Sequence, residues 1–483
     1  MTDDSDDRTS TGVAGLDEVL GGGLIPGRSY MLRGRPGTGK SLLALAYLID
    51  GVERGEDCLF VALEETEADI RRNAAAVGLD IDGIAVLDLT PDSSAFTDDE
   101  TYAVFDPGTV EERSLTDAIT ERVRELEPTR VVIDPMTQLR YLAPDEYQLR
   151  KQILALTSFL EQVGATLVFT TQATSTHSDE DFQFMADGVI ELGDTGSGRT
   201  VSVPKFRGSG TRSGTHTLRI RDSGLSVYPE LEPSHHHRPF ASESIPSGIP
   251  EFDEQLHGGI ERGTVSIISG PTGVGKTTTG AQFMKEAAGR GERSAIYLFE
   301  EDERTFLERC TAVNIPVDRM VERETLSIEE IEALEYTPQE FANTVRTDVE
   351  ESDTQLVMID GINGYELSIR GDEHTFRSEL HRLCRYLKNM GVTVVLIEEV
   401  ATVTGDFQAT EGEISYLADN IVFLRYIEMD GELRKVVGVL KKRTSDFQRS
   451  LREFEITQHG IKIGDPLTGL RGILRGTPEQ PGE

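Results

Sequence analysis

Cysteine is scarce in this sequence. Only three occur among its 483 residues, Cys58, Cys310 and Cys384, and they are far apart and odd in number. No C-x-x-C pair is present, so the sequence predicts neither a disulfide framework nor a zinc site. Cys58 falls in a run typical of a β-strand, where cysteine acts as a small core hydrophobe.

Long hydrophobic runs are absent as well. No apolar stretch approaches the roughly 20 residues that a helix needs to cross a bilayer. The first ten residues, from Met1 to Ser10, are acidic and polar, which is the opposite of a signal or transit peptide. We therefore expect a cytoplasmic protein with no membrane contact, whose length fits two to four domains at roughly 100–200 residues each.

Basic residues are few relative to acids. The sequence has 48 Lys and Arg against 85 Asp and Glu, which gives a net charge of −37, and only ten of the bases are lysine. Phosphate backbones repel such a surface, so broad nucleic-acid binding is disfavoured. The composition also suits concentrated salt, where charges are screened within a few ångströms, and resembles that of salt-loving archaea. An acidic protein of an ordinary cytoplasm is the alternative.

An internal duplication organises the chain. The same spacing of 236 positions separates Gly12 from Gly248 and Lys40 from Lys276, which chance does not maintain. The seam contains three prolines and a run of three histidines that could bind metal. No acidic or cysteine cluster flanks that run, so we favour a solvated linker. The predicted parts are a first domain at 1–228, a linker at 229–244, a second domain at 245–471 and a flexible tail at 472–483.

Each half alternates short β-branched runs with helical patterns. Continuous apolar strands separated by helices, such as those predicted at 42–53 and 146–162, indicate a parallel sheet with helices on both faces. Ligands bind to such sheets at the carboxyl ends of the strands. The predicted strands are 29–33, 58–63, 130–133 and 166–171 in the first half, and 264–269, 295–299, 356–359 and 393–397 in the second.

The first strand of each half runs into a phosphate-binding loop. Both loops match G-x-x-x-x-G-K-[ST] between a strand and a helix, so backbone N–H groups and the helix N-terminus would hold phosphates of ATP. The lysines would reach the β- and γ-phosphates, and Ser41 and Thr277 would bind Mg²⁺. The candidate ATP-binding residues are Gly34, Gly37, Thr38, Gly39, Lys40 and Ser41, then Gly270, Thr272, Gly273, Val274, Gly275, Lys276, Thr277 and Thr278.

The second predicted strand of each half ends in a pair of acids. These are Glu64 with Glu65, and Glu300 with Glu301, again 236 positions apart. A carboxylate at a strand end beside the γ-phosphate can polarise the attacking water. The alternative is a pair of solvated acids at the mouth of a loop, but the recurrence at the same offset favours a catalytic role.

The third predicted strand of each half ends in an aspartate. An apolar run that closes on Asp134 or Asp360 is the Walker B pattern, in which the acid holds Mg²⁺ directly or through water. Together with Ser41 and Thr277, these two residues are the predicted metal ligands.

A Lys-x-Arg segment stands out near the end of each half. Lys205 and Arg207 would share one face of a strand, and so would Lys441 and Arg443. Such a pair is what a neighbouring subunit could offer to a γ-phosphate, as an arginine finger does. The alternative is an ordinary charged strand edge.

These duplicated motifs, together with the T/S-G-[VI] entry, resemble the KaiC-like ATPases, RecA-fold proteins with tandem domains. The resemblance runs from Ser10 to about Gly476. It implies an α/β fold of two tandem RecA-like P-loop NTPase domains, each a mostly parallel sheet flanked by helices. It also implies a hexameric ring that binds ATP and Mg²⁺ between subunits, with the acid pairs catalytic, the Lys-x-Arg segments reaching the next subunit's ATP, and regulatory protein partners.

One position departs from the resemblance. Clock-type members autophosphorylate on a Ser-Thr pair in the second domain, and alignment back from residues 418–421 places that pair on Ser415 and Tyr416. Ser415 is therefore a candidate phosphosite, although the tyrosine makes a two-step Ser/Thr cycle doubtful.

The two halves also differ in length and in one strand end. The spacing falls to 226 between Asp134 and Asp360 and later recovers to 236. We assign about ten extra residues to 92–112 and a longer second-half loop to 402–418, which indicates either a specialised second domain or a tolerated insertion. The first half has Thr171-Gln172 where the second has Glu398-Glu399, so we predict unequal hydrolysis rates.

The leading hypothesis is a regulatory ATPase with serine autokinase activity in its second domain. The alternative is a DNA-dependent ATPase of the RecA/RadA type, active in recombination or unwinding, because the fold alone does not decide function. The acidic charge and the absence of a basic stripe or of aromatic residues interleaved with basic ones argue against it. A scaffold with degenerate sites is disfavoured because neither phosphate loop is damaged.

Overall fold

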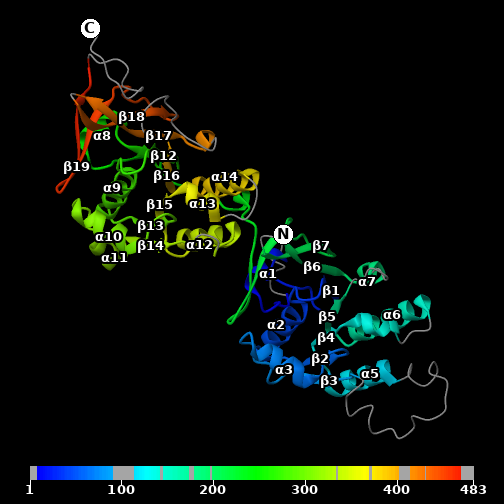
Figure 1. The fold of residues 1–483 in the computed structure, drawn as a ribbon. Coiled ribbons are helices and arrows are strands. Elements are labelled where there is room, and N and C mark those ends of the chain that lie inside the picture. The colour runs from blue at the N-terminus through cyan, green and yellow to red at the C-terminus, as the bar shows by residue number, and fades with distance from the viewer. Residues whose placement is uncertain are drawn as a thin grey trace. The chain divides into compact units, whose positions relative to one another are not determined.

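The computed structural model describes residues 8–90, 114–141, 145–172, 179–195, 198–332, 335–368, 373–401, 414–429 and 431–468. The chain divides into two compact units, Met1–Glu230 and Leu231–Glu483 (Figure 1). The boundary lies inside the stretch that the sequence assigns to a linker. No helix of the described residues is long and apolar enough to span a bilayer.

A nine-stranded sheet forms the first unit, in the order β3-β2-β4-β5-β1-β6-β7-β8-β9. The pairs from β3 to β6 are parallel, and those from β6 to β9 are antiparallel. The strands are β1 (Ser29–Gly34), β2 (Cys58–Ala62), β3 (Ala85–Asp88), β4 (Arg130–Asp134), β5 (Thr166–Thr171), β6 (Gly188–Thr195), β7 (Gly198–Phe206), β8 (His216–Arg221) and β9 (Gly224–Tyr228).

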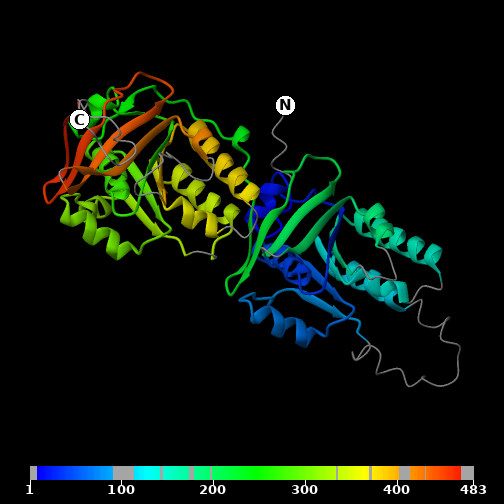
Figure 2. The same cartoon turned by 45° about the horizontal axis from the view of Figure 1, so that its top comes forward.

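Helices cover both faces of this sheet (Figure 2). Neighbouring residues of β2 point to opposite faces, as a strand requires. Phe60 packs in one core with Leu48, and Leu59 packs in a second core with Ile153. The helices are α1 (Ala14–Val19), α2 (Lys40–Glu53), α3 (Glu67–Ala75), α5 (Ser114–Leu126), η2 (Met136–Tyr141), α6 (Glu146–Gln162) and α7 (Glu180–Met185).

The second unit repeats this architecture. Its main sheet has the order β14-β13-β15-β16-β12-β17-β18-β19-β20, with β10 (Ser244–Ile245) and β11 (Ile260–Glu261) in a small separate sheet. The strands are β12 (Val265–Gly270), β13 (Arg293–Leu298), β14 (Leu326–Glu330), β15 (Thr354–Asp360), β16 (Thr393–Glu399), β17 (Asn420–Met429), β18 (Glu432–Lys442), β19 (Arg452–Thr457) and β20 (Gly460–Pro466). The predicted fold class is thereby confirmed for both halves.

Two cores again sandwich the second sheet. Phe283 of α9 packs with Ile296 of β13 on one face, while Leu387 of α14 packs with Ala295 on the other. The helices are η3 (Pro233–His235), α8 (Pro250–Gln255), α9 (Lys276–Gly289), α10 (Glu303–Ala312), α11 (Val317–Glu322), α12 (Pro338–Glu350), α13 (Ile362–Ser368), α14 (Glu373–Asn389) and η4 (Ile414–Tyr416).

Strand pairing corrects one assignment of loop length. Tyr426 pairs with Lys435, nine positions later, whereas Asp194 pairs with Arg199, five positions later, so the β17–β18 hairpin is four residues longer than β6–β7. The prediction that the whole extension lies in 402–418 is therefore wrong, because part of it lies at a hairpin tip, where insertions disturb no core contact. The insertion predicted at 92–112 lies outside the described residues.

The histidine run is not wholly a solvated linker. His236 Nδ1 lies 2.8 Å from Glu350 Oε1, and its ring packs edge-on against Tyr386 with the centroids 5.1 Å apart. The backbone N–H of Arg238 also donates to the carbonyl oxygen of Asn389. The sequence pattern missed this attachment, because the partners lie more than 100 positions away. His235 and His237 are exposed.

Candidate active sites

The two phosphate loops leave the carboxyl ends of β1 and β12, the strands that lie between β5 and β6 and between β16 and β17. Gly39 and Gly275 cap the following helices with φ of 103° and 114°, a left-handed conformation that favours glycine. A Cβ at Gly39 would lie 2.7 Å from Ile220 Cδ1, and one at Gly275 would lie 2.4 Å from Ile456 Cδ1. A side chain at either position would have to displace an isoleucine and adopt a strained φ, so both positions favour glycine.

The P-loop lysines are buried among backbone oxygens. Lys40 Nζ donates to the carbonyls of Gly34 at 2.9 Å and Arg35 at 3.1 Å, and Lys276 Nζ donates to that of Pro271 at 3.1 Å. Burial lowers the pKa of both lysines, and neighbouring carboxylates oppose this shift. Each ammonium therefore stands inside its loop, where a phosphate would replace backbone oxygens as its partner.

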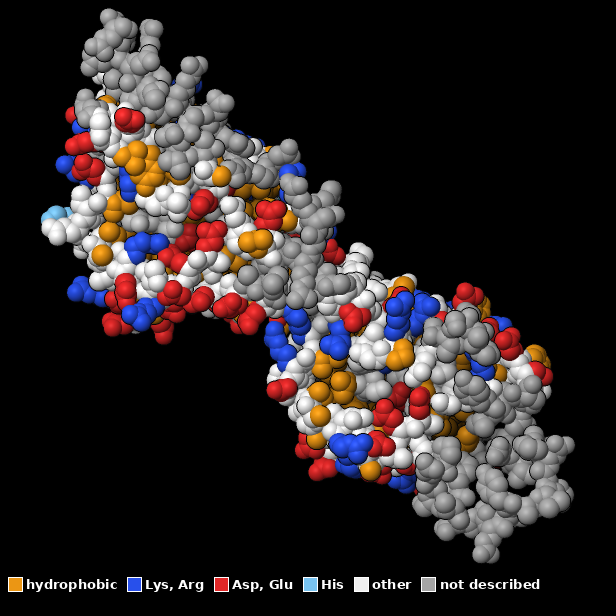
Figure 3. All heavy atoms as spheres, in the orientation of Figure 1, with side chains coloured by type: hydrophobic (Ala, Val, Ile, Leu, Met, Phe, Trp, Pro, Cys, Tyr) orange, Lys and Arg blue, Asp and Glu red, His pale blue; other side chains and the backbone are white. Residues whose placement is uncertain are grey.

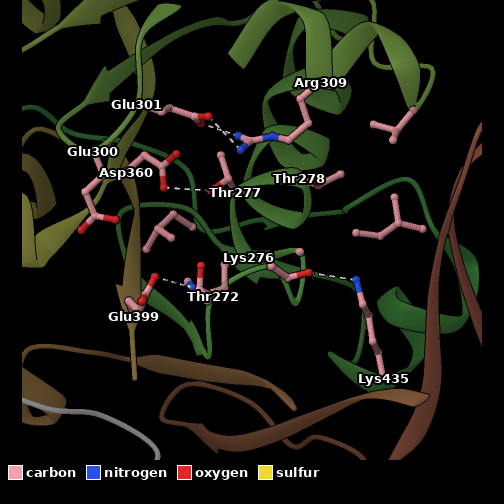
Figure 4. A pocket seen from close by; sticks show the side chains of 15 residues that line it. Thr272, Lys276, Thr277, Thr278, Glu300, Glu301, Arg309, Asp360, Glu399 and Lys435 are labelled. Carbon is pink, nitrogen blue, oxygen red and sulfur yellow. Dashed lines mark hydrogen bonds and ion pairs between the residues drawn. The ribbon is translucent and has the colours of Figure 1, made fainter. Parts of the chain in front are cut away.

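A cavity of about 370 Å³ lies over the second P-loop (Figure 4). It collects most of the residues predicted for the second site, but Val274 is not among them, because its side chain is fully buried in the core. The cavity is lined by Thr272, Gly273, Gly275, Lys276, Thr277, Thr278, Glu300, Glu301, Arg309, Val313, Asp360, Ile397, Glu399, Lys435 and Ile456.

Glu300 is the carboxylate best placed to act as a base in this cavity. Burial raises its pKa, with a further contribution from the charge of Glu399, while a hydrogen bond from the Gly364 backbone opposes the shift. Gly361 makes room for it, since a Cβ there would lie 2.6 Å from Glu300 Cγ, and its φ is +97°. A raised pKa lies closer to neutral pH, and a general base is most effective when its pKa is near the working pH.

Asp360 and Thr277 place a carboxylate and a hydroxyl oxygen side by side near Lys276. The Thr277 hydroxyl donates to Asp360 Oδ1 at 3.0 Å. Burial, then the charge of Glu301, raises the pKa of Asp360 to about 7. A buried carboxylate next to a hydroxyl fits Mg²⁺, which prefers oxygen ligands. Water molecules and phosphate oxygens usually supply the remaining ligands of this ion. The described residues contain no cluster of three or more His, Cys, Asp or Glu that could hold a metal alone.

The second acid of each pair is held by a residue of the following helix. Arg309 NH1 donates to Glu301 Oε2 at 2.8 Å, and NH2 donates to the other oxygen, so the two side chains point toward each other in Figure 4. In the first unit, Asn73 Nδ2 donates to Glu65 Oε2 at 3.0 Å. In each pair, the first acid, Glu64 or Glu300, is therefore the one that the following helix does not hold. Arg309 stands 236 positions after Asn73, but no sequence motif marks either residue.

The first site assembles the same elements with different partners. Gln172 Nε2 donates to Glu64 Oε2 at 3.3 Å, and the Thr170 hydroxyl donates to Asp134. Asp134 ends β4 next to the end of β5, so the predicted acids gather at the carboxyl edge of this sheet too. Ser41 is the second residue of α2.

Sequence reasoning also missed a cation above each P-loop. Lys435 Nζ donates to the Gly273 carbonyl at 3.0 Å, and Arg199 Nε donates to the Gly37 carbonyl at 3.4 Å. A signal for these two cations exists in the sequence, because Lys435 follows Arg199 by the repeat spacing of 236 positions. Both residues lie in antiparallel strands, outside the usual phosphate-binding motifs. These side chains place positive charge at the backbone of each P-loop.

The Lys-x-Arg segments make their contacts outside the P-loops, and Lys441 and Arg443 do not line the cavity of the second unit. Lys205 Nζ donates to the carbonyls of Gln183 and Ala186, at 2.7 and 2.6 Å, and Arg207 lies 3.6 Å from Asp187. Both segments lie at the end of the antiparallel hairpin farthest from the turn, since Phe206 pairs with the first residue of β6.

In the second unit, the same segment contacts the candidate phosphosite. Lys441 Nζ donates to the carbonyl of Ser415 at 2.8 Å, and Arg443 NH2 donates to that of Tyr416 at 3.0 Å. Ser415 lies in η4, and Tyr416 is 47% exposed and stacks on His381. The basic pair therefore fixes the backbone that carries Ser415.

Comparisons with known proteins agree with this geometry. The family model for the KaiC ATPase matches residues 9–232 and again 245–468. The circadian clock oscillator protein KaiC of Parasynechococcus marenigrum is 28% identical over 486 residues, covering 97% of this chain and 93% of its own. The circadian clock protein KaiC3 of Synechocystis is 28% identical (98% and 95% covered), and KaiC of Synechococcus elongatus is 26% identical (97% and 91%). Because the family model matches both halves, this chain belongs to the KaiC family of ATPases.

Proposed function

We propose that each unit binds MgATP and hydrolyses it, with Glu64 and Glu300 as the general bases. The convergence of Lys276, Thr277, Asp360 and Glu300 on one cavity carries this proposal. Lys276 would hold the β- and γ-phosphates, and Thr277 and Asp360 would hold Mg²⁺, which neutralises charge on the phosphates.

Glu300 would take a proton from the water that attacks the γ-phosphorus. The bond between the γ-phosphorus and the bridging oxygen then breaks, and ADP and phosphate leave. Glu301 would keep its bonds to Arg309 during this step and shape the entrance to the cavity. In the first unit Glu64 would act in the same way, with Gln172 orienting its carboxylate.

Substitution of the P-loop lysines tests this proposal. Lys40→Ala and Lys276→Ala are each expected to remove one of two unequal contributions to ATP turnover, and the double variant to remove both, measured as ADP release in molar KCl. A double variant that keeps the original rate contradicts the ATPase assignment, and equal rates in the two single variants contradict the predicted inequality. Stimulation by single-stranded DNA would instead favour the RecA/RadA-type alternative.

We further propose a hexameric ring in which Lys205, Arg207, Lys441 and Arg443 approach ATP bound to the next subunit. The family membership supports the ring, and the position of both segments away from their own unit's P-loop supports action on a neighbour. On the face drawn in Figure 3, acidic side chains gather along α10, α11 and α12, and basic ones are interspersed, which suits protein partners better than nucleic acid. The family membership supports a regulatory role, and the acidic composition supports a cytoplasmic setting in a salt-rich cell.

Ser415 is our proposed phosphoacceptor. Lys441 and Arg443 bond the backbone of Ser415 and Tyr416, so the serine lies beside the residues proposed to meet the neighbour's γ-phosphate. Transfer would break the bond between the γ-phosphorus and the bridging oxygen, join the phosphorus to Ser415 Oγ, and release ADP and the hydroxyl proton.

Intact mass after incubation with MgATP tests this assignment. A gain of roughly 80 Da, the mass of one phosphate, is expected in the unmodified chain and not in Ser415→Ala. Lys276→Ala serves as a second control and should also prevent the gain. ADP release without any gain in mass would exclude the autokinase activity and leave the ATPase.

A further inference from the structure

A second cavity of the second unit, which we call the amino-edge cavity, has a volume of about 620 Å³, within the range of small-molecule sites. Arg293 begins β13, Thr325 directly precedes β14, and Asp353 directly precedes β15, so three neighbouring parallel strands begin at this cavity. The P-loop instead follows the carboxyl end of β12, which runs parallel to them. The amino-edge cavity therefore lies at the opposite edge of the sheet from the candidate ATP site. Its lining consists of residues 291–293, 323–325, 352–353 and 355.

The lining of this cavity is polar throughout. Thr325, Ser352 and Gln355 supply hydroxyl and amide groups, and none of the described residues that line it has an aliphatic or aromatic side chain. The cavity over the P-loop differs in this respect, since Val313 and Ile456 line it. A nucleobase or an apolar ligand would find no surface to pack against in the amino-edge cavity. A small, strongly polar ligand fits it better.

Two arginines of the lining have no carboxylate partner among the residues that the structure describes. Arg293 NH1 donates to the backbone carbonyl of Glu324 at 2.7 Å, while its Nε is shielded from solvent and has no hydrogen-bond partner. Arg323 is exposed and forms no ion pair within the same set of residues. A guanidinium carries five N–H donors, so most donors of these two arginines are available to a ligand.

The acids of the lining do not neutralise the two arginines. Glu292 Oε1 lies 2.6 Å from Arg262 NH2, and Asp353 Oδ1 lies 2.6 Å from Arg238 NH1, so both acids are paired with other cations. The exposed carboxylate of Glu324 is the one lining acid without an ion pair to the described residues. The amino-edge cavity therefore has more unpaired positive charge than negative charge, in a chain whose net charge is −37.

The first unit has no equivalent pair of arginines. Asp57 stands 236 positions before Arg293. The strand registers of β3 and β14 place Ile81, which is buried, at the position of Arg323. An acid would repel an anion, and a buried isoleucine offers it no hydrogen bond. We therefore expect one site of this kind in each chain.

We propose that the amino-edge cavity binds a small oxyanion ligand with at least two negative charges, held by the guanidiniums of Arg293 and Arg323. Phosphate esters and dicarboxylates share this chemistry, because the planar fork of an arginine can bond two oxygens of either group at once. Ser352 would donate a further hydrogen bond from its hydroxyl. The site is separate from both P-loops, so the inference does not rest on the proposed function.

Equilibrium dialysis of the full chain against labelled anions tests the proposal. The chain carries Lys40→Ala and Lys276→Ala, which remove the P-loop lysines as phosphate partners. The probes are inorganic phosphate and succinate, each measured separately in molar KCl. At least one probe should bind saturably to a single site. Arg293→Gln and Arg323→Gln should each weaken that binding by roughly tenfold or more, because each removes a charged hydrogen-bond donor. Binding of phosphate alone identifies a phosphorylated ligand, and binding of succinate alone identifies a dicarboxylate.

Arg319→Gln is the matched control. It removes one guanidinium from an exposed side chain of α11, four positions before Arg323 and outside the lining, so the Kd should stay within about twofold. The inference is overturned if neither probe binds saturably, if both lining variants keep the original affinity, or if Arg319→Gln weakens binding as much as they do. If circular dichroism shows that Arg293→Gln is unfolded, Arg323→Gln alone decides, because its side chain is exposed.

Discussion

Replacing Glu300 with Gln in a chain that also carries Lys40→Ala is expected to lower ATP turnover by about 10²- to 10⁴-fold, the usual contribution of a general base. The amide keeps the shape of the side chain but cannot accept the proton of the attacking water. The measurement is steady-state release of phosphate in molar KCl, compared with Lys40→Ala alone.

Glu301→Gln in the same background is the control for this prediction. Glu301 is bonded through both oxygens to Arg309, so its loss should change the entrance to the cavity more than the chemistry, and turnover should fall by less than about tenfold. A larger loss in Glu301→Gln than in Glu300→Gln would reverse the roles of the two acids.

Replacing Arg443 with Ala in the Lys40→Ala chain is expected to lower turnover at the second site on the order of 10³-fold, within the range of arginine fingers. Because the arginine is proposed to serve the next subunit, mixed rings should recover activity. When Arg443→Ala chains are mixed with Glu300→Gln chains, roughly a quarter of the interfaces in a ring combine an intact Glu300 with an intact Arg443.

Two outcomes would contradict this arrangement. A mixture as inactive as its parents means that Arg443 acts inside its own unit, through its bonds to Asp419 and the Tyr416 carbonyl. The guanidinium of Arg449 packs against Phe447. A similar loss of turnover in Arg449→Ala would mean that the loss of any basic residue in this region lowers turnover. The turnover of the Arg443→Ala chain and the recovery in mixed rings therefore test both the ring and the role of Arg443.

Much of the fold was readable from the sequence, because local patterns determine it. Predicted strand 166–171 coincides with β5, and predicted helix 146–162 coincides with α6. Buried parallel strands are continuous apolar runs, and such runs need no tertiary context to be recognised. The edge strands β3 and β14 were not predicted, since they are short and less completely buried.

The antiparallel extension was harder to anticipate. Only the Lys-x-Arg segments drew attention to β7 and β18, and the full hairpins emerged from pairing between residues. An offset between repeats does not show where in a stretch of chain the extra residues lie. The sequence therefore wrongly places four residues of the β17–β18 hairpin in 402–418.

The site residues also fall into two groups, those that sequence motifs identify and those that only the structure reveals. Sequence motifs identified the P-loops, Glu300 and Asp360, because each belongs to a fixed strand-to-loop pattern. Arg309 and Lys435 belong to no such pattern, and their roles depend on contacts with Glu301 and Gly273.

The sequence by itself determined that this chain is a duplicated P-loop protein, since glycine spacing, apolar runs and the recurring 236-residue register are properties of the chain alone. Only the tertiary structure decided how the two sites differ. Gln172 and Glu399 differ in the residue that each contacts, which is Glu64 for the amide and Lys276 for the carboxylate. The physical reason is that charge interactions depend on distance and burial, and both arise when parallel strands far apart in sequence end at one edge of a sheet.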